Sequence, residues 1–236
     1  MRVLSIFHHD DTGPGVFGDS VAARGHELEH WNITEGSPPP RPPTSYGAVL
    51  ISGGSMNVGQ EDSFPWLREE YRIIRELLRE QVPTFGICLG SQLVAHAAGA
   101  RVGPAPEPEI GWYDVELTRE AREDPVFATA PERFLALQWH SYCSALPAGA
   151  VPLAQNQICL QAYRIEDFAW GIQFHAEVTR ETLLFWISVY EADGNGAHEQ
   201  FDAPAAKEEL ELHISGWNDF GRELSSRFLA VAEAKA

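Results

Sequence analysis

Residues 86–90 read Gly-Ile-Cys-Leu-Gly, and this stretch decides the fold and the chemistry that the sequence predicts. It follows a short apolar run that Pro83 opens, and it precedes a helix-like run at residues 91–98. A cysteine at a sharp turn from strand to helix is lifted out of the sheet, and small neighbours let the backbone pass closely. Cys88 could equally be a small buried core residue. The local pattern alone leaves both interpretations open.

The composition indicates a folded α/β protein with an acidic surface. Of the 236 residues, 44% are hydrophobic, which suits one α/β domain with additions and a sizeable core. The formal charge is −17, so binding to nucleic acid or to an anionic membrane is not expected. No apolar stretch is long enough to span a bilayer, and the first apolar run is too short for a signal peptide.

The chain has 3 cysteines, Cys88, Cys143 and Cys159. An odd and sparse set gives no disulfide framework and favours a reducing compartment, so we expect a cytoplasmic protein. The sequence lacks the close cysteine pair that is typical of zinc sites, and we expect neither a metal nor a cofactor. Cys143 and Cys159 are interpreted as structural residues.

Strand-like and helix-like segments alternate through the first hundred residues. Strands are predicted over residues 3–7, 26–31, 48–52 and 83–88, and helices over residues 16–23, 66–78 and 91–98. Because the connections are short, this alternation implies a mostly parallel sheet with helices on both faces. A proline-rich stretch at residues 35–43 is typical of an extended surface loop.

The pattern changes after Gly99. Short strands are predicted over residues 112–118, 133–138, 151–154, 158–163 and 169–174, and they suggest a smaller antiparallel extension of the sheet. Helices follow over residues 181–190 and from about 205 to 234, on either side of a break at residues 194–196. We therefore expect one domain at residues 1–193 and a C-terminal helical extension at residues 194–236 that packs on the core or on a partner.

A second segment, Gly-Ile-Gln-Phe-His-Ala-Glu at residues 171–177, offers the groups that a reactive thiol requires. A free thiol has a pKa of about 8.5, so an imidazole is needed to raise its ionised fraction, and a carboxylate usually orients that imidazole. His175 and Glu177 could fill these roles, since side chains at i and i+2 of a strand share a side. A parallel strand beside that of Cys88 would bring them to the carboxyl edge of the sheet.

Together these segments resemble the class I, or triad-type, glutamine amidotransferase domain, and the overall pattern is similar to stand-alone GMP synthase-like proteins. The similarity covers nearly all of the first 190 residues, including Gly-Gly at residues 53–54 and Trp-His-Ser at residues 139–141. The resemblance implies a flavodoxin-like core. It also implies that Cys88 is the nucleophile, that His175 is the general base and acid, and that Glu177 orients His175.

The resemblance implies the remaining parts of the site as well. The backbone N–H groups of Gly54 and Leu89 would form the oxyanion hole, and Gln92, Ser141 and Tyr142 would contact the substrate. The implied reaction is hydrolysis of the side-chain amide of glutamine, or of a related γ-glutamyl amide, through a thioester. Ammonia and glutamate are the products.

Two histidines near the N-terminus have no role in this resemblance. His8 and His9 end the first predicted strand, close to the expected carboxyl edge. They could reach the site or bind a metal together with Asp10 and Asp11, although such a cluster is more often a solvated loop.

Three functional hypotheses follow. The first is a stand-alone amidotransferase-like hydrolase acting on glutamine or another γ-glutamyl compound. The second is a glutaminase subunit that delivers ammonia to a separate synthetase, which the resemblance implies because the family usually channels ammonia. The sequence shows no phosphate-binding Gly-x-x-x-x-Gly-Lys loop, so the synthetase would be another protein. The third is a catalytically silent regulatory or binding module, against which the intact Cys88, His175 and Glu177 argue. A homodimer through the C-terminal helix is a further expectation.

Overall fold

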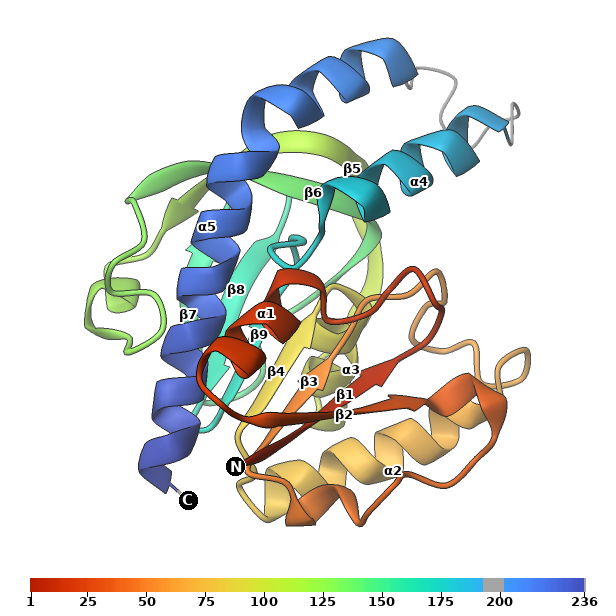
Figure 1. The fold of residues 1–236 in the computed structure, drawn as a ribbon, viewed down its shortest axis with the longest axis vertical. Coiled ribbons are helices and arrows are strands. Elements are labelled where there is room, and N and C mark those ends of the chain that lie inside the picture. Colours follow the sequence, from red (N-terminus) through yellow and green to blue (C-terminus); the bar gives the residue numbers. More distant parts are fainter. Residues whose placement is uncertain (193–201, 236) are drawn as a thin grey trace.

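The computed structural model describes residues 1–192 and 202–235, and within them a nine-stranded sheet runs through the molecule (Figure 1). The strands are β1 (Arg2–Phe7), β2 (Glu27–Asn32), β3 (Ala48–Ile51), β4 (Thr84–Ile87), β5 (Val102–Leu117), β6 (Arg133–Ser144), β7 (Val151–Gln155), β8 (Leu160–Ile165) and β9 (Ala169–Ile172). The helices are α1 (Gly15–Ala23), α2 (Trp66–Arg79), α3 (Leu89–Ala97), α4 (Arg180–Ala192) and α5 (Ala203–Lys235). Short 3-10 turns lie at Ile33–Glu35, Pro43–Ser45 and Glu120–Glu123.

The strand order is β2-β1-β3-β4-β9-β8-β7-β5-β6. From β2 to β9 every neighbouring pair is parallel, and from β9 to β6 every pair is antiparallel. The parallel part has the 2-1-3-4-5 order of flavodoxin-like sheets, with β9 as its fifth strand. This confirms the predicted α/β fold, in which a parallel sheet carries an antiparallel extension.

Alternating side chains along the central strands build two cores, one on each face of the sheet. Val3 and Leu50 pack with α1 and α5, whereas Leu4 and Ile51 pack with α2 and α3. Such alternation follows from the two-residue period of a strand, and strands that are apolar on both faces are typical of a covered parallel sheet. In Figure 1, α1 and α5 lie in front of the central strands.

The last helix covers one face of the sheet. The buried residues of α5 include Leu210, Ile214, Trp217, Leu224 and Phe228, all of which belong to the core cluster shared with α1. The sequence predicts the same stripe, since these apolar residues fall mostly at steps of three, four or seven. The break expected at residues 194–196 lies outside the described residues.

The two longest strands exceed their predicted lengths. β5 begins ten residues before the predicted start, at Val102, and β6 continues to Ser144. Prolines at positions 104, 106 and 108 make the first half of β5 hard to recognise as a strand in the sequence, since proline is unusual inside a sheet. The β5–β6 pairing shifts register between Pro104 and Glu109, which is where this irregular backbone is accommodated.

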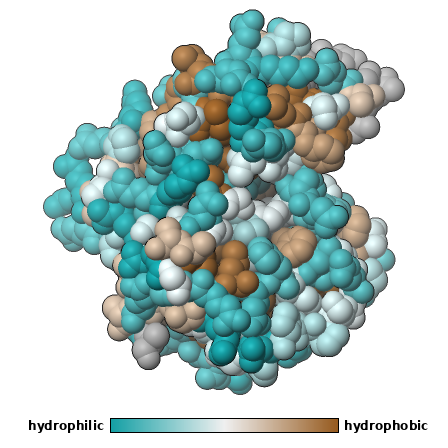
Figure 2. Space-filling view, in the orientation of Figure 1, coloured by the Kyte–Doolittle hydropathy of each residue, from teal (hydrophilic) through white to brown (hydrophobic). Residues whose placement is uncertain are grey.

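Apolar side chains also reach the surface near α4 and the beginning of α5. Phe185 and Val189 of α4 and Leu212 of α5 are among the exposed large hydrophobic residues, and Figure 2 shows brown surface over this end of the molecule. In the described part of the chain, no helix combines the length and the apolar character needed to cross a membrane.

Two glycines of α5 provide a matched test of how closely this helix packs. A Cβ added at Gly221 would lie 2.0 Å from the carbonyl oxygen of Ala176, while one at Gly216 would meet nothing within 4 Å. We expect Gly221→Ala to lower the free energy of unfolding by about 1–3 kcal/mol, because the helix must shift. Gly216→Ala should raise it by about 0.5–1 kcal/mol through helix propensity. Urea unfolding measures both, and equal stabilities would contradict the packing described.

Candidate active site

Cys88 stands alone between β4 and α3 in a backbone conformation that most residues avoid. Its φ is 49° and its ψ is −108°. The turn is tight on both sides, since a Cβ at Gly86 would lie 2.6 Å from the carbonyl oxygen of Gly90. A Cβ at Gly90 would lie 2.1 Å from the carbonyl oxygen of Ile51. The two glycines of the quoted stretch are therefore required for the close approach of backbone segments, as the sequence predicts.

His175 and Glu177 lie together at the carboxyl end of β9. Nδ1 of His175 is 2.8 Å from Oε1 of Glu177, and both side chains are about 95% buried. β9 ends at Ile172, two residues before the predicted end, so the pair lies in a bend and not in extended backbone. The sequence predicts that His175 and Glu177 meet because they share one side of a strand. The two side chains do meet, but the bend brings them together and not a strand.

Three parts of the chain hold this bend in place. The backbone N–H of Val16 at the start of α1 donates to the carbonyl oxygen of Glu177 at 2.8 Å. From α5, the indole N–H of Trp217 donates to the carbonyl oxygen of His175 at 2.7 Å, and Asn218 donates to that of Val178 at 2.7 Å. The sequence gives Trp217 and Asn218 no role at the site, because α5 lies outside the region of resemblance. A tryptophan on the apolar stripe was the available signal.

The thiol, the imidazole and the carboxylate form one electrostatic unit. A Cβ at Gly53 would lie 3.0 Å from Cε1 of His175 and 3.5 Å from Cβ of Cys88, so both of these side chains lie against Gly53. Burial acts to lower the pKa of His175, but the charges of Glu177 and Cys88, with hydrogen bonds to both, raise this pKa to about 10. The imidazole therefore holds its proton at neutral pH.

A second buried pair lies beneath the glycine turn. Nδ1 of His8 is 2.8 Å from the carbonyl oxygen of Gly53, and Nε2 is 3.0 Å from Oε1 of Glu70. Since a carbonyl oxygen and a carboxylate can only accept, both ring nitrogens of His8 donate and the ring is an imidazolium. The Gly53 carbonyl shares its peptide with the N–H of Gly54, so His8 fixes the direction of that donor.

The electrostatics agree with this assignment. Burial acts to lower the pKa of His8, but the charge of Glu70 and hydrogen bonds to Glu70 and Gly53 outweigh it, so the pKa is raised. With both nitrogens engaged, His8 is not available for the metal pair that the sequence left open. His9 is exposed and lies 3.1 Å from the hydroxyl of Ser55. No pattern in the sequence marks Glu70, a buried acid on the inner face of α2, as part of the site.

The expected substrate residues lie where α3 meets β6. The side-chain amide of Gln92 donates to the carbonyl oxygen of Tyr142 at 2.9 Å and to Oε1 of Gln173 at 3.1 Å. Ser141 is exposed, whereas Gln92 is buried. The thiol of Cys88 is 4.0 Å from the carbonyl oxygen of Trp139, the residue that begins this part of β6. The structure thus places Gln92, Ser141 and Tyr142 next to the cysteine turn.

Leu89 contributes its backbone to the same place. It is the first residue of α3, and a helix leaves its first N–H groups without partners inside the helix. A Cβ at Gly54 would lie 2.9 Å from the side chain of Leu89, so the two residues that carry the expected oxyanion donors are in contact range.

An aromatic group from α4 closes the other side of the histidine. The ring of Trp186 meets His175 edge to face with centroids 4.9 Å apart, and it lies 5.7 Å from the ring of Trp139. The indole N–H of Trp186 donates to Asp11 at 2.9 Å. This packing limits the orientations open to the imidazole.

Comparison with known proteins decides the family. The glutamine amidotransferase class-I profile matches residues 19–183. This chain belongs to the class I glutamine amidotransferase family. A glutamine amidotransferase from Thermotoga maritima is 29% identical with a TM-score of 0.88, over 97% of this chain and 98% of that one. A second one, from Methylobacillus flagellatus, is 26% identical with a TM-score of 0.85, over 98% and 94%.

Curated relatives of this chain point to the same family. The glutamine amidotransferase-like protein YfeJ of Salmonella typhimurium is 28% identical over 187 residues, which is 78% of each chain. GMP synthase of Thermomicrobium roseum is 35% identical over 136 residues, which is 57% of this chain and 24% of that protein. The match thus spans about a quarter of the GMP synthase. The predicted family is confirmed.

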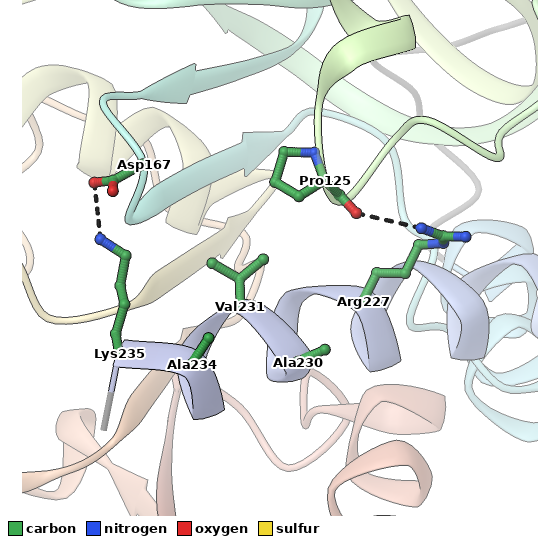
Figure 3. A pocket seen from close by; sticks show the side chains of 7 residues that line it. All are labelled: Pro125, Asp167, Arg227, Ala230, Val231, Ala234 and Lys235. Carbon is green, nitrogen blue, oxygen red and sulfur yellow. Dashed lines mark hydrogen bonds and ion pairs between the residues drawn. The ribbon is translucent and has the colours of Figure 1, made fainter.

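A shallow groove elsewhere on the molecule lacks comparable chemistry. It lies between the C-terminal end of α5 and the loops at Pro125 and Asp167 (Figure 3). Its charged groups are already paired, since Lys235 is 2.8 Å from Asp167 and Arg227 donates to the carbonyl oxygen of Pro125. The groove is therefore not the candidate site.

The buried His8–Glu70 pair yields a prediction about stability. His8→Gln leaves the Glu70 carboxylate buried without its cation, and we expect the free energy of unfolding to fall by about 3–5 kcal/mol at acidic pH. A histidine whose pKa is higher in the folded than in the unfolded protein stabilises the fold. This stabilisation is complete below the unfolded pKa of about 6.5, and it is lost as the pH rises through the pKa of the folded protein. The difference in the free energy of unfolding between wild type and His8→Gln should therefore become smaller with increasing pH.

Urea unfolding at a series of pH values measures this gap. His9→Gln is the matched control, since His9 is exposed and lies next to His8. A gap that stays constant or widens with pH would show that His8 is not charged in the folded protein.

Proposed function

We propose that this family member is an amidotransferase-like hydrolase that cleaves the side-chain amide of glutamine, or of a related γ-glutamyl compound. The observation that carries the proposal is the meeting of the Cys88 turn with the bonded His175–Glu177 pair. A thiol at a strained turn, an imidazole and an orienting carboxylate together satisfy the requirements of nucleophilic catalysis. The resemblance noted in the sequence supports the same roles.

The proposed reaction has two stages. The thiolate of Cys88, paired with the protonated His175, attacks the amide carbon of glutamine, the carbon–nitrogen bond breaks, and His175 gives its proton to the departing ammonia. Water then attacks the resulting thioester with His175 as base, and glutamate leaves as the thiolate and the protonated imidazole are restored. Glu177 holds the imidazole in the orientation that both stages require.

The oxyanion that forms in each stage requires donors. The proposed donors are the N–H groups of Gly54 and Leu89, and one such donor is typically worth about 3 kcal/mol of barrier. The hydrogen bond from His8 to Gly53 favours this role, because it orients the peptide that carries the Gly54 N–H. Gln92 supports the neighbouring backbone of Tyr142, and with Ser141 these residues are the proposed contacts to the amino-acid part of the substrate.

A second candidate function is that of a glutaminase subunit delivering ammonia to a separate synthetase. The likeness to GMP synthases favours it, since the match covers 24% of one of them and leaves most of that protein without a counterpart. A homodimer through α5 and a cytoplasmic location stay predictions. So does the division into residues 1–193 and 194–236, in which α5 would be an extension that completes the site.

The proposal is tested by incubating the purified protein with glutamine and a panel of γ-glutamyl compounds, with and without cell extract. We expect release of ammonia and a thioester at Cys88 visible by mass spectrometry. Cys88→Ala should abolish the thioester, and His175→Ala should slow turnover roughly 10²–10⁴-fold. His30→Ala, an exposed histidine on β2, is the control that keeps full activity.

The outcomes separate the three hypotheses. Turnover that rises sharply only with extract supports the subunit role. No turnover and no thioester under any condition would favour the silent regulatory or binding module, and full activity of Cys88→Ala would exclude the mechanism proposed.

The raised pKa of His175 predicts the pH dependence. Because the imidazolium is the acid that protonates ammonia, kcat/KM should stay high until the pH approaches about 10 and fall above it. Glu177→Gln keeps the shape but removes the charge that raises this pKa most, so the alkaline limb should move to lower pH. A pH profile of kcat/KM for both proteins measures the shift, and an unmoved limb would contradict the role given to Glu177.

A further inference from the structure

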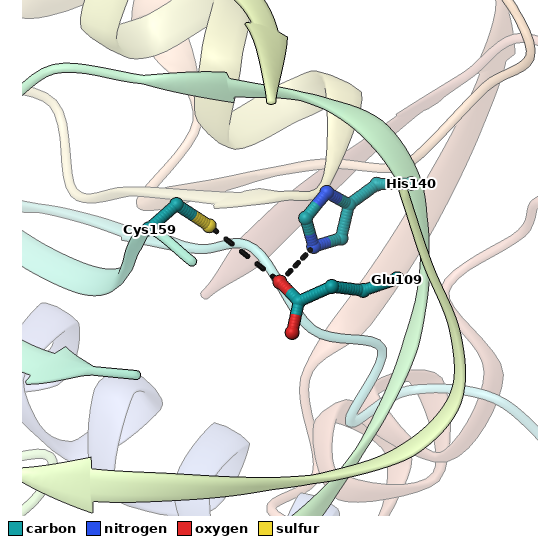
Figure 4. A group of neighbouring side chains, drawn as sticks. All are labelled: Glu109, His140 and Cys159. Atoms are coloured by element: carbon teal, nitrogen blue, oxygen red, sulfur yellow. Dashed lines mark hydrogen bonds and ion pairs between the residues drawn. The ribbon is translucent and has the colours of Figure 1, made fainter. Parts of the chain in front are cut away.

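A second cluster of reactive side chains lies on the antiparallel part of the sheet. Glu109 and His140 are direct cross-strand partners on β5 and β6, and Cys159 precedes β8. One ligand atom from each of the three lies within 4.8 Å of the others. Figure 4 shows the imidazole and the thiol both directed at the same carboxylate. The proposed hydrolysis uses none of these groups.

The contact between histidine and carboxylate is short but is not a hydrogen bond. Nε2 of His140 is 3.1 Å from Oε2 of Glu109, and the two side chains are at most 2% exposed. Yet neither ring nitrogen of His140 has a hydrogen-bond partner among the described residues. A buried ion pair should align its donor with the oxygen. Two ligands of one metal ion instead point at the ion, and so come close without being aligned with each other.

The ligand atoms lie about as close together as those of a four-coordinate metal site. Tetrahedral zinc with bonds of about 2.0–2.1 Å to nitrogen and oxygen and 2.3 Å to sulfur separates its ligand atoms by about 3.3–3.8 Å. The thiol of Cys159 donates to Oε2 of Glu109 at 3.7 Å, a separation within this range, and the 3.1 Å from Nε2 to Oε2 is slightly shorter than the range.

The carboxylate is held by further polar groups, as metal-binding carboxylates usually are. The side-chain amide of Asn156 donates to Oε1 of Glu109 at 2.6 Å, and that of Gln161 donates to Oε2 at 3.1 Å and to Sγ of Cys159 at 3.3 Å. Gln138 in turn donates to Gln161 at 2.7 Å. These amides fix the carboxylate and leave the histidine unsatisfied.

A second thiol adjoins the cluster. The side chains of Cys143 and Cys159 lie within hydrogen-bonding reach of each other. Cys143 is on β6, three residues after His140, and its thiol would have to turn from Cys159 toward the cluster to supply a fourth ligand.

We propose that Glu109, His140 and Cys159, with Cys143 as the fourth ligand, bind Zn²⁺. Imidazole and thiolate ligands select borderline-soft ions, and zinc accepts all three ligand types in four-coordinate sites. The sequence predicts no metal site, because the two cysteines do not form a close pair in the sequence. They meet only after β8 has paired in the sheet.

The location gives the ion a consequence for the proposed reaction. His140 and Cys143 flank Ser141 and Tyr142, and the Tyr142 carbonyl accepts from Gln92 beside the cysteine turn. Bound zinc would fix both ends of this four-residue segment. This second statement rests on the proposed function and predicts a lower KM for glutamine in the zinc form, with little change in kcat.

Metal binding is tested directly, without any activity assay. The reduced, metal-free full-length chain is titrated with Zn²⁺ against a chromogenic chelator, and Co²⁺ is added to a second sample. We expect one Zn²⁺ per chain, a rise of Tm with zinc, and a thiolate-to-cobalt absorption band. His140→Ala and Cys159→Ser should each weaken zinc binding by more than about 100-fold. Cys143→Ser should weaken it and reduce the cobalt band.

Cys88→Ala is the matched control, because Cys88 is the thiol outside the cluster, and it should bind zinc like the wild type. Circular dichroism confirms that each variant is folded before titration. The proposal is overturned if the reduced wild type binds no zinc, if Cys88→Ala loses binding while Cys159→Ser keeps it, or if Cys143 and Cys159 are found joined as a disulfide in protein that binds no metal. If the protein binds zinc but does not hydrolyse glutamine or a γ-glutamyl compound, the zinc site is supported and only the proposed hydrolysis is contradicted.

Discussion

The backbone at Cys88 is bent into a conformation that costs roughly 1–3 kcal/mol, and the surrounding structure has to hold it there. The N–H of Cys88 donates to the carbonyl oxygen of Ile172 at 2.8 Å, which ties the turn to β9. Gly90 lies against the backbone of Ile51, which ties it to β3. The side chain consequently emerges where three parallel strands end. The other candidate groups can act on the thiol only because the turn holds it in this position.

The histidine side of the site is held differently, by elements that are distant in the chain. α1 donates to the backbone of Glu177, and α5 donates to the backbone on either side of Ala176. Each of these hydrogen bonds ends on a carbonyl oxygen of the bend, so the side chains of His175 and Glu177 remain available to each other. Trp186 adds a flat surface against which the imidazole packs. The bend thus obtains from tertiary contacts the rigidity that a strand would otherwise provide.

Much of the fold could be predicted from the sequence because its parallel half obeys local rules. The bounds of every strand and α-helix before Gly99 were predicted within a few residues, and the two glycines around Cys88 indicated the turn. The long β5–β6 ribbon was underestimated, since its prolines are tolerated through a register shift that no local pattern reveals. Glu70 and Trp217 could not be found either, because an acid or a tryptophan on a helix looks the same whether it faces a histidine or a hydrophobic core.

The hydrogen bonds from α5 to the bend can form only after α5 has been synthesised. Trp217 lies 42 residues after His175, and Asn218 lies 40 residues after Val178. A ribosome makes the cysteine and the histidine first and the helix that steadies the histidine afterwards. The nascent chain therefore carries the thiol well before it can carry the completed site, and the last long helix acts as the closing step of assembly.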